Sequence, residues 1–204
     1  MQQEQKEATR RGLLEAAHAV FSELSYAAAT IDDIVRRAGV SRTSFYRHFD
    51  SKWAVAKALF AQLMPTVHAL WDEIGSSSEP DERHIADVLG RMLGVLMEHR
   101  PLIAIMREAD IIEADSASIV RATHDDIIRR LGVRIPAFRN ALAGTPAAEE
   151  MRIRAHLLFL QFDELVYTLA VRQWPLDHRI AVRVMAQQFR HFIESGASTR
   201  DRGR

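Results

Sequence analysis

The stretch Ser41-Arg-Thr-Ser-Phe-Tyr-Arg-His-Phe49 carries the strongest structural signal in this chain. Read as a helix, it has a favourable N-cap in Ser41, and Phe45 and Phe49 share one face at spacing i, i+4. Gly39, just before it, suits a sharp turn with positive φ. A shorter helical pattern precedes that turn, and two short helices joined by a glycine turn predict a helix-turn-helix. Its second helix carries polar side chains long enough to reach base edges in a major groove.

The composition predicts a soluble protein without a disulfide framework. The chain has 204 residues, of which 48% are apolar and 26% charged, and no cysteine. The lack of cysteine excludes disulfides and thiolate metal sites. The first residues lack the apolar core of a signal peptide, and no window approaches eighteen uncharged apolar residues. We therefore expect a cytoplasmic protein with no membrane contact.

Charge is unevenly distributed along the chain, although the net charge is zero. Residues 36–57 include six lysines or arginines and one acid, whereas residues 79–126 include eleven acids and five arginines. This asymmetry concentrates the attraction for phosphate near the predicted helix-turn-helix, while the acidic range repels it.

The remaining sequence also predicts helices, because apolar residues recur at threes and fours and no alternating strand pattern occurs. The ranges with this pattern are about 8–24, 30–38, 52–71, 80–98, 101–109, 119–131, 146–173 and 176–194. Residues 1–7 are expected to fray, residues 25–29 to form a connector, and the tail from Ser195 to be disordered.

Three further features refine the helical prediction. Pro65 lies inside an apolar stripe and predicts a kink near Ala61–Pro65, because proline removes one backbone hydrogen bond. Thr145 followed by Pro146 is a helix start signal. The segment His156–Tyr167 is apolar nearly all round, so we expect it to be covered on every side.

Thirteen residues stand at fixed spacings through the predicted helix-turn-helix. They are Thr30, Ile31, Ile34, Ala38, Gly39, Val40, Ser41, Phe45, Tyr46, His48, Phe49, Ser51 and Lys52. This pattern resembles the DNA-binding signature of TetR-family transcriptional regulators, over about residues 10–60. The resemblance implies an all-α fold of about nine helices, with a three-helix DNA-binding domain at residues 1–52 and a ligand-binding and dimerisation domain at residues 53–204.

The resemblance also implies partners. They are a double-stranded DNA operator, a second copy of the chain paired through its last two helices, and a small-molecule effector that usually releases the protein from DNA. The chain departs from the family pattern at three places. Ser25 stands where glycine is usual, so a positive φ there would cost about 1 kcal/mol. Thr43 replaces a common glycine and adds a methyl group that could touch thymine. Trp53 and Ala54 stand where acids often support the helix dipole.

The predicted DNA-binding residues are Thr30, Arg36, Arg37, Ser41, Arg42, Thr43, Ser44, Tyr46, Arg47, His48 and Lys52. Arg42 is favoured as the base reader, because its guanidinium can grip guanine O6 and N7. Tyr46 and His48 resemble the family's phosphate-contacting pair, and Lys52 at a helix N-terminus suits a phosphate. Thr30 could contact a phosphate or only cap its helix, and Thr43 and Ser44 could contact DNA or face solvent.

The predicted ligand-binding residues are large adaptable side chains and one acid. They are Trp71, Met92, Leu96, Met106, Phe159, Phe162 and Asp163. Each large side chain could instead simply fill the core. Asp163 and its neighbour Glu164 stand in an apolar helix, so one of them either faces a cavity and favours a cationic or hydrogen-bonding effector or pairs with Arg107 or another arginine.

No chemistry beyond binding is predicted. The histidines have no metal-ligand spacing, no cofactor is expected, and the His124–Asp126 run is expected to be solvated. No glycine-rich phosphate loop or nucleophile elbow occurs, so we expect no enzyme. The favoured function is a ligand-responsive regulator, most simply a repressor. The alternatives are a helical-bundle enzyme, which leaves the basic segment unexplained, and a helical adaptor that does not bind DNA.

Overall fold

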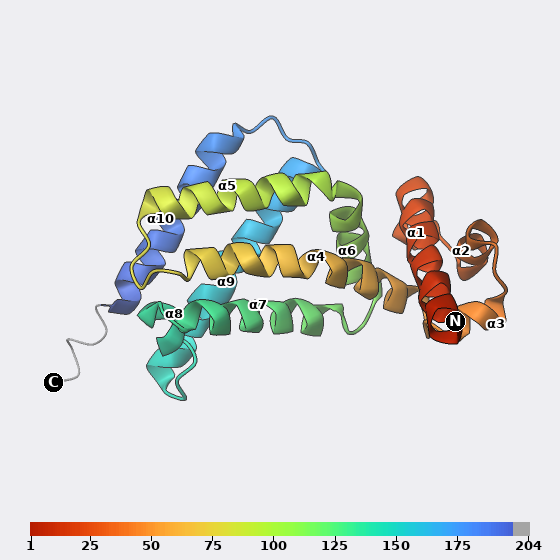
Figure 1. The fold of residues 1–204 in the computed structure, drawn as a ribbon. Coiled ribbons are helices and arrows are strands. Elements are labelled where there is room, and N and C mark those ends of the chain that lie inside the picture. The colour runs from red at the N-terminus through yellow and green to blue at the C-terminus, as the bar shows by residue number, and fades with distance from the viewer. Residues whose placement is uncertain (198–204) are drawn as a thin grey trace. The chain divides into compact units, whose positions relative to one another are not determined.

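The computed structural model describes residues 1–197, which form helices and connecting turns (Figure 1). The ten helices of this range are α1 (Gln2–Ala28), α2 (Ile31–Ala38), α3 (Arg42–Tyr46), α4 (Lys52–Ile74), α5 (Glu82–Glu98), α6 (Arg100–Ile112), α7 (Ser116–Gly132), α8 (Pro136–Asn140), α9 (Pro146–Ala170) and α10 (His178–Ala197). The all-α prediction is confirmed, with one helix more than expected in the described range. Most of the tail predicted to be disordered lies outside the described residues. Within residues 1–197, no helix is long and apolar enough to cross a membrane.

The chain folds into two compact units. The first comprises Met1–Pro65 and His99–Ser116, and the second comprises, among the described residues, Thr66–Glu98 and the chain from Ala117 to Ala197. The first unit therefore contains α6 and the first half of α4 in addition to the predicted DNA-binding helices. The functional boundary after residue 52 stays a prediction.

The first helix is longer than its apolar pattern predicts. The buried face of α1 consists of Leu13, Leu14, Ala16, Ala17, Val20 and Phe21. The expected fraying of residues 1–7 is wrong, because helical structure begins at Gln2. The residues on either side of Ser25 are helical as far as Ala28, but Ser25 itself has φ 68° and ψ 162°, so α1 is kinked there within the expected connector. The positive φ expected at Ser25 is confirmed.

Side chains after Ser25 attach the end of α1 to α6. Tyr26 is fully buried, and its hydroxyl donates a hydrogen bond to Glu113. Burial is the main reason that the pKa of Tyr26 lies above its ordinary value, and the hydrogen bond to Glu113 adds to the shift. The indole nitrogen of Trp53 donates to Asp115 at 2.6 Å, just beyond α6. These contacts explain why residues 99–116 belong to the first unit.

Helix α4 continues through Pro65 to Ile74, so the proline does not end it. The boundary between the two units falls directly after this residue. The kink predicted near Ala61–Pro65 stays a prediction.

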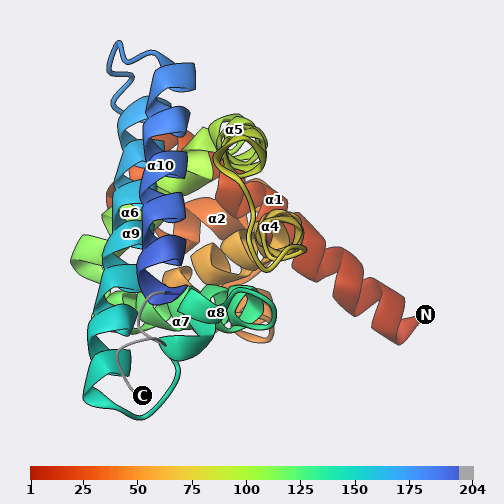
Figure 2. The same cartoon turned by 90° about the vertical axis from the view of Figure 1, so that its left-hand side faces the viewer.

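In the second unit, α10 packs against α5, α8 and α9, and Figure 2 shows α9 and α10 running side by side. The start signal of α9 is confirmed, because the hydroxyl of Thr145 accepts a hydrogen bond from the Ala148 N–H at 3.1 Å. Helix α7 ends at Gly132, and α8 begins at Pro136.

Candidate DNA-binding surface

Helix α2 begins with a capping box. The hydroxyl of Thr30 accepts a hydrogen bond from the Asp33 N–H at 3.2 Å, and the Thr30 N–H donates to the Asp33 carboxylate at 3.1 Å. The hydroxyl and N–H of Thr30 are the main reasons that the pKa of Asp33 lies below its ordinary value. Thr30 therefore caps its helix in the free protein, as one of its two predicted roles requires.

The turn between α2 and α3 has the geometry expected of a helix-turn-helix. Gly39 closes α2 with φ 66° and ψ 30°, a left-handed conformation that glycine adopts without steric cost. The Val40 N–H then donates to the Val35 carbonyl at 3.1 Å. These bonds satisfy the end of α2 and redirect the chain into α3.

Helix α3 is a single capped turn held by two phenylalanines. The hydroxyl of Ser41 accepts a hydrogen bond from the Ser44 N–H at 3.1 Å, which confirms Ser41 as the N-cap. Phe45 and Phe49 are buried, with ring centroids 6.0 Å apart, as predicted. The regular helix ends at Tyr46, earlier than the predicted limit at Phe49.

The side chains predicted to contact DNA from α3 remain accessible. Arg42 keeps 59% of its side-chain surface, Tyr46 is 48% exposed, and Thr43 is also exposed. Ser44 and His48 are half-buried. The short helix thus buries its aromatic face and presents a polar face to solvent.

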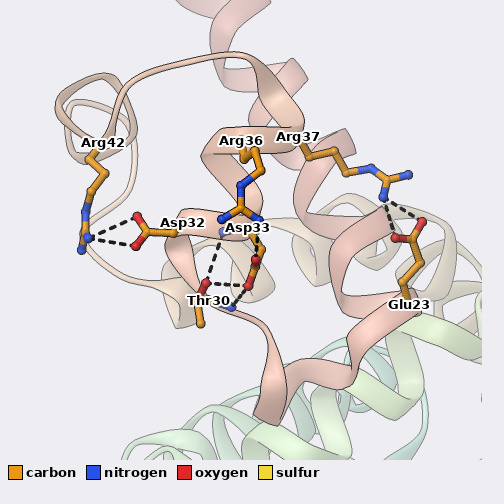
Figure 3. Close-up of polar contacts among 7 residues, drawn as sticks. All are labelled: Glu23, Thr30, Asp32, Asp33, Arg36, Arg37 and Arg42. Carbon is orange, nitrogen blue, oxygen red and sulfur yellow. Dashed lines mark hydrogen bonds and ion pairs between the residues drawn. The ribbon is translucent and has the colours of Figure 1, made fainter.

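Three of the predicted contact arginines are ion-paired in the free protein (Figure 3). The pairs are Arg36 with Asp33 at 3.1 Å, Arg37 with Glu23 at 2.7 Å, and Arg42 with Asp32 at 3.1 Å. The pKa of Arg42 is raised first by its hydrogen bond to Tyr46 and then by the charge of Asp32. The sequence reasoning missed these pairs, because it considered these arginines only as contacts to DNA.

Lys52 uses its ammonium group inside the first unit. It donates to the carbonyls of Tyr26 and Ala29 at 2.7 and 3.0 Å, and it lies 4.3 Å from the centroid of the Tyr26 ring. Burial lowers the pKa of Lys52, against the opposing charges of Glu113 and Glu108. The predicted phosphate contact of Lys52 would therefore compete with its support of the end of α1.

His48 lies among cations that the sequence reasoning did not connect with it. Burial is the main reason that the pKa of His48 is lowered, and the charges of Lys6, Arg47 and Arg10 lower it further. The guanidinium carbon of Arg10 lies 5.0 Å from the centroid of the Phe49 ring. The spacing i, i+4 between Lys6 and Arg10 was visible in the sequence, but their position beside His48 depends on the packing of α1.

Most of the predicted ligand-binding side chains belong to the core of the second unit. Trp71, Met92, Leu96, Phe159 and Phe162 are buried. The Trp71 ring lies 5.3 Å from Phe159 and 5.9 Å from Phe162, centroid to centroid. Met106, by contrast, is half-buried in the first unit.

Asp163 pairs with a histidine. Its carboxylate lies 2.9 Å from Nε2 of His124 and keeps 55% of its side-chain surface exposed. Of the two neighbouring acids, Asp163 and Glu164, it is Glu164 that pairs with an arginine, at 3.5 Å from Arg172. The solvated His124 expected from the sequence is wrong, because His124 is 4% exposed and packs its ring against Phe159.

The rest of the His124–Asp126 run is also engaged. His156 Nε2 lies 3.1 Å from Asp125 Oδ1, and His68 Nε2 lies 3.5 Å from Asp126 Oδ2. The run therefore links α7 to both α4 and α9 within the second unit. Among the described residues, no group of three or more histidine, aspartate or glutamate side chains is placed to hold a metal ion.

The comparisons with known proteins agree with the helix-turn-helix. Residues 13–59 match the family of bacterial regulatory proteins, tetR family. The HTH-type transcriptional regulator TtgR of Pseudomonas putida is 32% identical over 95 residues, which are 47% of this chain and 42% of TtgR. The probable HTH-type transcriptional regulator ArpR of Pseudomonas putida matches to the same extent. The matched region thus spans less than half of either relative.

A fold likeness extends over nearly the whole chain. A TetR-family transcriptional regulator from Streptomyces coelicolor superposes with a TM-score of 0.63 and 20% identity, over 95% of this chain and 83% of that one. This identity is too low to transfer a ligand, but the shared fold agrees with the family match. The named proteins that the chain resembles are regulators of transcription. Over residues 13–59, which include the helix-turn-helix, the chain is therefore similar to the TetR family of bacterial regulatory proteins.

Proposed function

We propose that the chain is a ligand-responsive repressor of transcription that binds a palindromic operator as a homodimer and leaves it when a small-molecule effector binds. The observation that carries this proposal is the two-faced α3. Phe45 and Phe49 anchor the segment from inside, while Arg42, Thr43 and Tyr46 stay accessible. An anchored helix with an accessible polar face is the element that a major groove admits.

The proposed contacts divide between bases and phosphates. Arg42 and Thr43 project from the first turn of α3, where base edges are read, and Arg42 can grip a guanine with both arms of its guanidinium. The groups proposed to bind the backbone are Thr30, Arg36, Arg37, Ser41, Ser44, Tyr46, Arg47, His48 and Lys52. Arg36 and Arg37 must exchange a carboxylate for a phosphate, and Lys52 must give up two carbonyls.

The homodimer is supported by apolar surface on the last two helices. On α9, Ile153, Leu157 and Leu160 are each about half exposed and recur at spacings of four and three. On α10, Ile180 and Val184 are similarly exposed. The expectation that the apolar segment of α9 is buried on every side is therefore wrong for the single chain. A second copy of the chain would bury these exposed side chains.

A shallow groove strengthens the same proposal. It runs between α9 and α10 and is lined by side chains that include Leu157, Leu158 and Phe192. A two-fold axis through this surface would set α9 and α10 of one subunit against the same helices of its partner. The two copies of α3 would then address two half-sites of one palindrome.

The proposed effector site is the aromatic core of the second unit. Trp71, Phe159 and Phe162 are in ring contact, so an effector must displace part of this packing. Asp163 offers a carboxylate to a cationic or hydrogen-bonding group, and its partner His124 lies against Phe159. Helix α4 begins in the first unit and carries Trp71 in the second. It is therefore the proposed link between effector and DNA.

The direct test is selection of DNA from a library of duplexes with a random central region. The wild-type protein should enrich a palindromic sequence, whereas Arg42→Ala should enrich it weakly or lose a base preference in each half-site. Arg152→Ala is a matched control, since Arg152 is also accessible and ion-paired, to Glu149 on α9. No enrichment by the wild-type protein would contradict the proposal.

The effector can be sought with the selected duplex. Candidate compounds should release the labelled duplex in a concentration-dependent way, and Phe159→Ala should shift that concentration without weakening DNA binding itself. Release that is unchanged in Phe159→Ala and in Asp163→Asn would contradict the assigned site.

A further inference from the structure

Basic side chains of α1 gather beside the end of the helix-turn-helix. Arg10 lies over the Phe49 ring, at 5.0 Å from its centroid, and Phe49 directly follows His48 in the sequence. Lys6 lies one helical turn before Arg10, so both side chains share one face of α1. Lys6, Arg10 and Arg47 are all exposed.

These cations differ from the arginines of α2 and α3 in their partners. Arg36, Arg37 and Arg42 each lie within 3.1 Å of a carboxylate oxygen. Within residues 1–197, neither Lys6 nor Arg10 has an ion pair with a carboxylate. Arg47 has none in that range either.

Within the described part of the chain, the acids of the first turns of α1 form no ion pair with Lys6, Arg10 or Arg47. Glu4 pairs with the amino group of Met1 at 2.7 Å, and Glu7 accepts a hydrogen bond from Gln3 at 3.0 Å. Lys6 and Arg10 also lie close enough to His48 to act on its protonation, because the charges of both help to lower the pKa of His48.

We propose that Lys6 and Arg10 extend the DNA-binding surface, and that with Arg47 and His48 they bind the phosphate backbone beside the groove that α3 enters. This inference rests on the proposed DNA-binding function and adds two residues of α1 to it. An unpaired cation can bind a phosphate without first releasing a carboxylate. The four residues therefore suit sequence-independent contact, while Arg42 and Thr43 suit base reading.

The test is a salt titration of binding to a fluorescent mixed-sequence duplex of about 30 base pairs. The slope of log K against log [salt] becomes less negative by about 0.9 for each phosphate that the protein no longer neutralises. If each subunit neutralises two phosphates fewer, the dimer of a Lys6→Gln, Arg10→Gln variant should have a slope less negative by about 3.6.

Two further variants identify the cause. Arg10→Lys keeps the charge and should retain the wild-type slope. Arg11→Gln removes one positive charge at the next position of α1. Arg11 is not among the charges that lower the pKa of His48, so this variant should leave the slope unchanged. Urea unfolding of each variant checks that the fold is retained.

The outcomes separate this inference from the function on which it rests. If the wild-type protein binds the duplex with no salt dependence, or does not bind, the proposed function itself fails. If the wild type binds with a steep slope and the Lys6→Gln, Arg10→Gln variant matches it, only the α1 surface is overturned. An equal change of slope in Arg11→Gln would also overturn it, because net charge would then explain the effect.

A second readout needs no DNA. Removing two positive charges should raise the pKa of His48, as measured from its ring proton by NMR, because those charges oppose protonation. A pKa of His48 that is the same in the Lys6→Gln, Arg10→Gln variant and the wild type would contradict the arrangement of α1 beside His48.

Discussion

Arg42 Nη1 lies 3.1 Å from Asp32 Oδ1, so in the free protein the favoured base-reading arginine is held by an acid of the preceding helix. Binding a guanine requires Arg42 to leave this carboxylate or to share its guanidinium. The pair holds the guanidinium of Arg42 beside Asp32 (Figure 3), and the negative charge of Asp32 offsets part of the positive potential that would attract DNA.

Asp32→Asn should therefore strengthen binding to the selected operator, because the competing charge is removed. Arg42→Ala should weaken it by roughly tenfold or more. In the Arg42→Ala background, Asp32→Asn should have a smaller effect, since its main partner is absent. Fluorescence anisotropy at one fixed salt concentration measures all four proteins. Equal effects of Asp32→Asn in both backgrounds would contradict the coupling.

Ser25→Gly should stabilise the protein. Ser25 has φ 68° and ψ 162°, a region that residues other than glycine occupy at a cost of about 1–3 kcal/mol. Glycine relieves that strain, so the free energy of unfolding from urea titration should rise by about this amount. Ser25→Ala is the control, because it removes the hydroxyl and retains the strain. A gain in Ser25→Ala equal to that in Ser25→Gly would contradict the explanation.

The stability of the protein should depend on His68 in mildly acidic solution. Burial is the main reason that the pKa of His68 is lowered, with Arg130 next, while Asp126 and Asp72 act in the opposite direction. The unfolded chain therefore binds this proton more tightly than the folded protein does. The stability that depends on a neutral His68 is fully present above the unfolded pKa of about 6.5, and it is lost as the pH falls through the lower pKa of the folded protein.

Accordingly, the free energy of unfolding should fall less between pH 7.5 and pH 5 in His68→Gln than in the wild type. Urea titrations at a series of pH values provide the comparison, and the His68 ring proton gives the folded pKa by NMR. Titration of His68 above pH 6.5 in the folded protein would contradict the predicted direction.

Leu157 and Leu160 are 54% and 48% exposed on α9, which makes them the sharpest test of the dimer. The Leu157→Glu, Leu160→Glu variant should be monomeric by light scattering and should bind the operator much more weakly, because one subunit engages one half-site. Val133→Glu is the control, since Val133 is also an exposed apolar residue of the second unit. A dimer that persists in the double variant would place the interface elsewhere.

Local features of the fold were predictable because their causes lie within a few residues. Ser41 and Thr145 cap their helices through N–H groups three positions along, and Gly39 turns the chain where its missing side chain is needed. Ser25 could be assigned a positive φ from the family resemblance, and the structure has it.

Contacts between distant residues were not predictable in the same way. His124 looks solvated within its own helix, and only the packing of α7 against α9 brings it to Asp163 and Phe159. Lys52 looks free at a helix start, yet the end of α1 supplies two carbonyls for it. The residues proposed to face DNA could be named from spacing, whereas their partners in the free protein depend on tertiary structure.

The proposed function requires two copies of α3 to enter major grooves on one face of a duplex. Hydroxyl-radical footprinting of the selected operator examines this requirement without any change to the protein. We expect two symmetric protected patches whose centres lie about 34–36 Å apart, or a multiple of that distance. A single unsymmetrical patch, or protection at a spacing that puts the half-sites on opposite faces of the duplex, would contradict the proposed mode of binding.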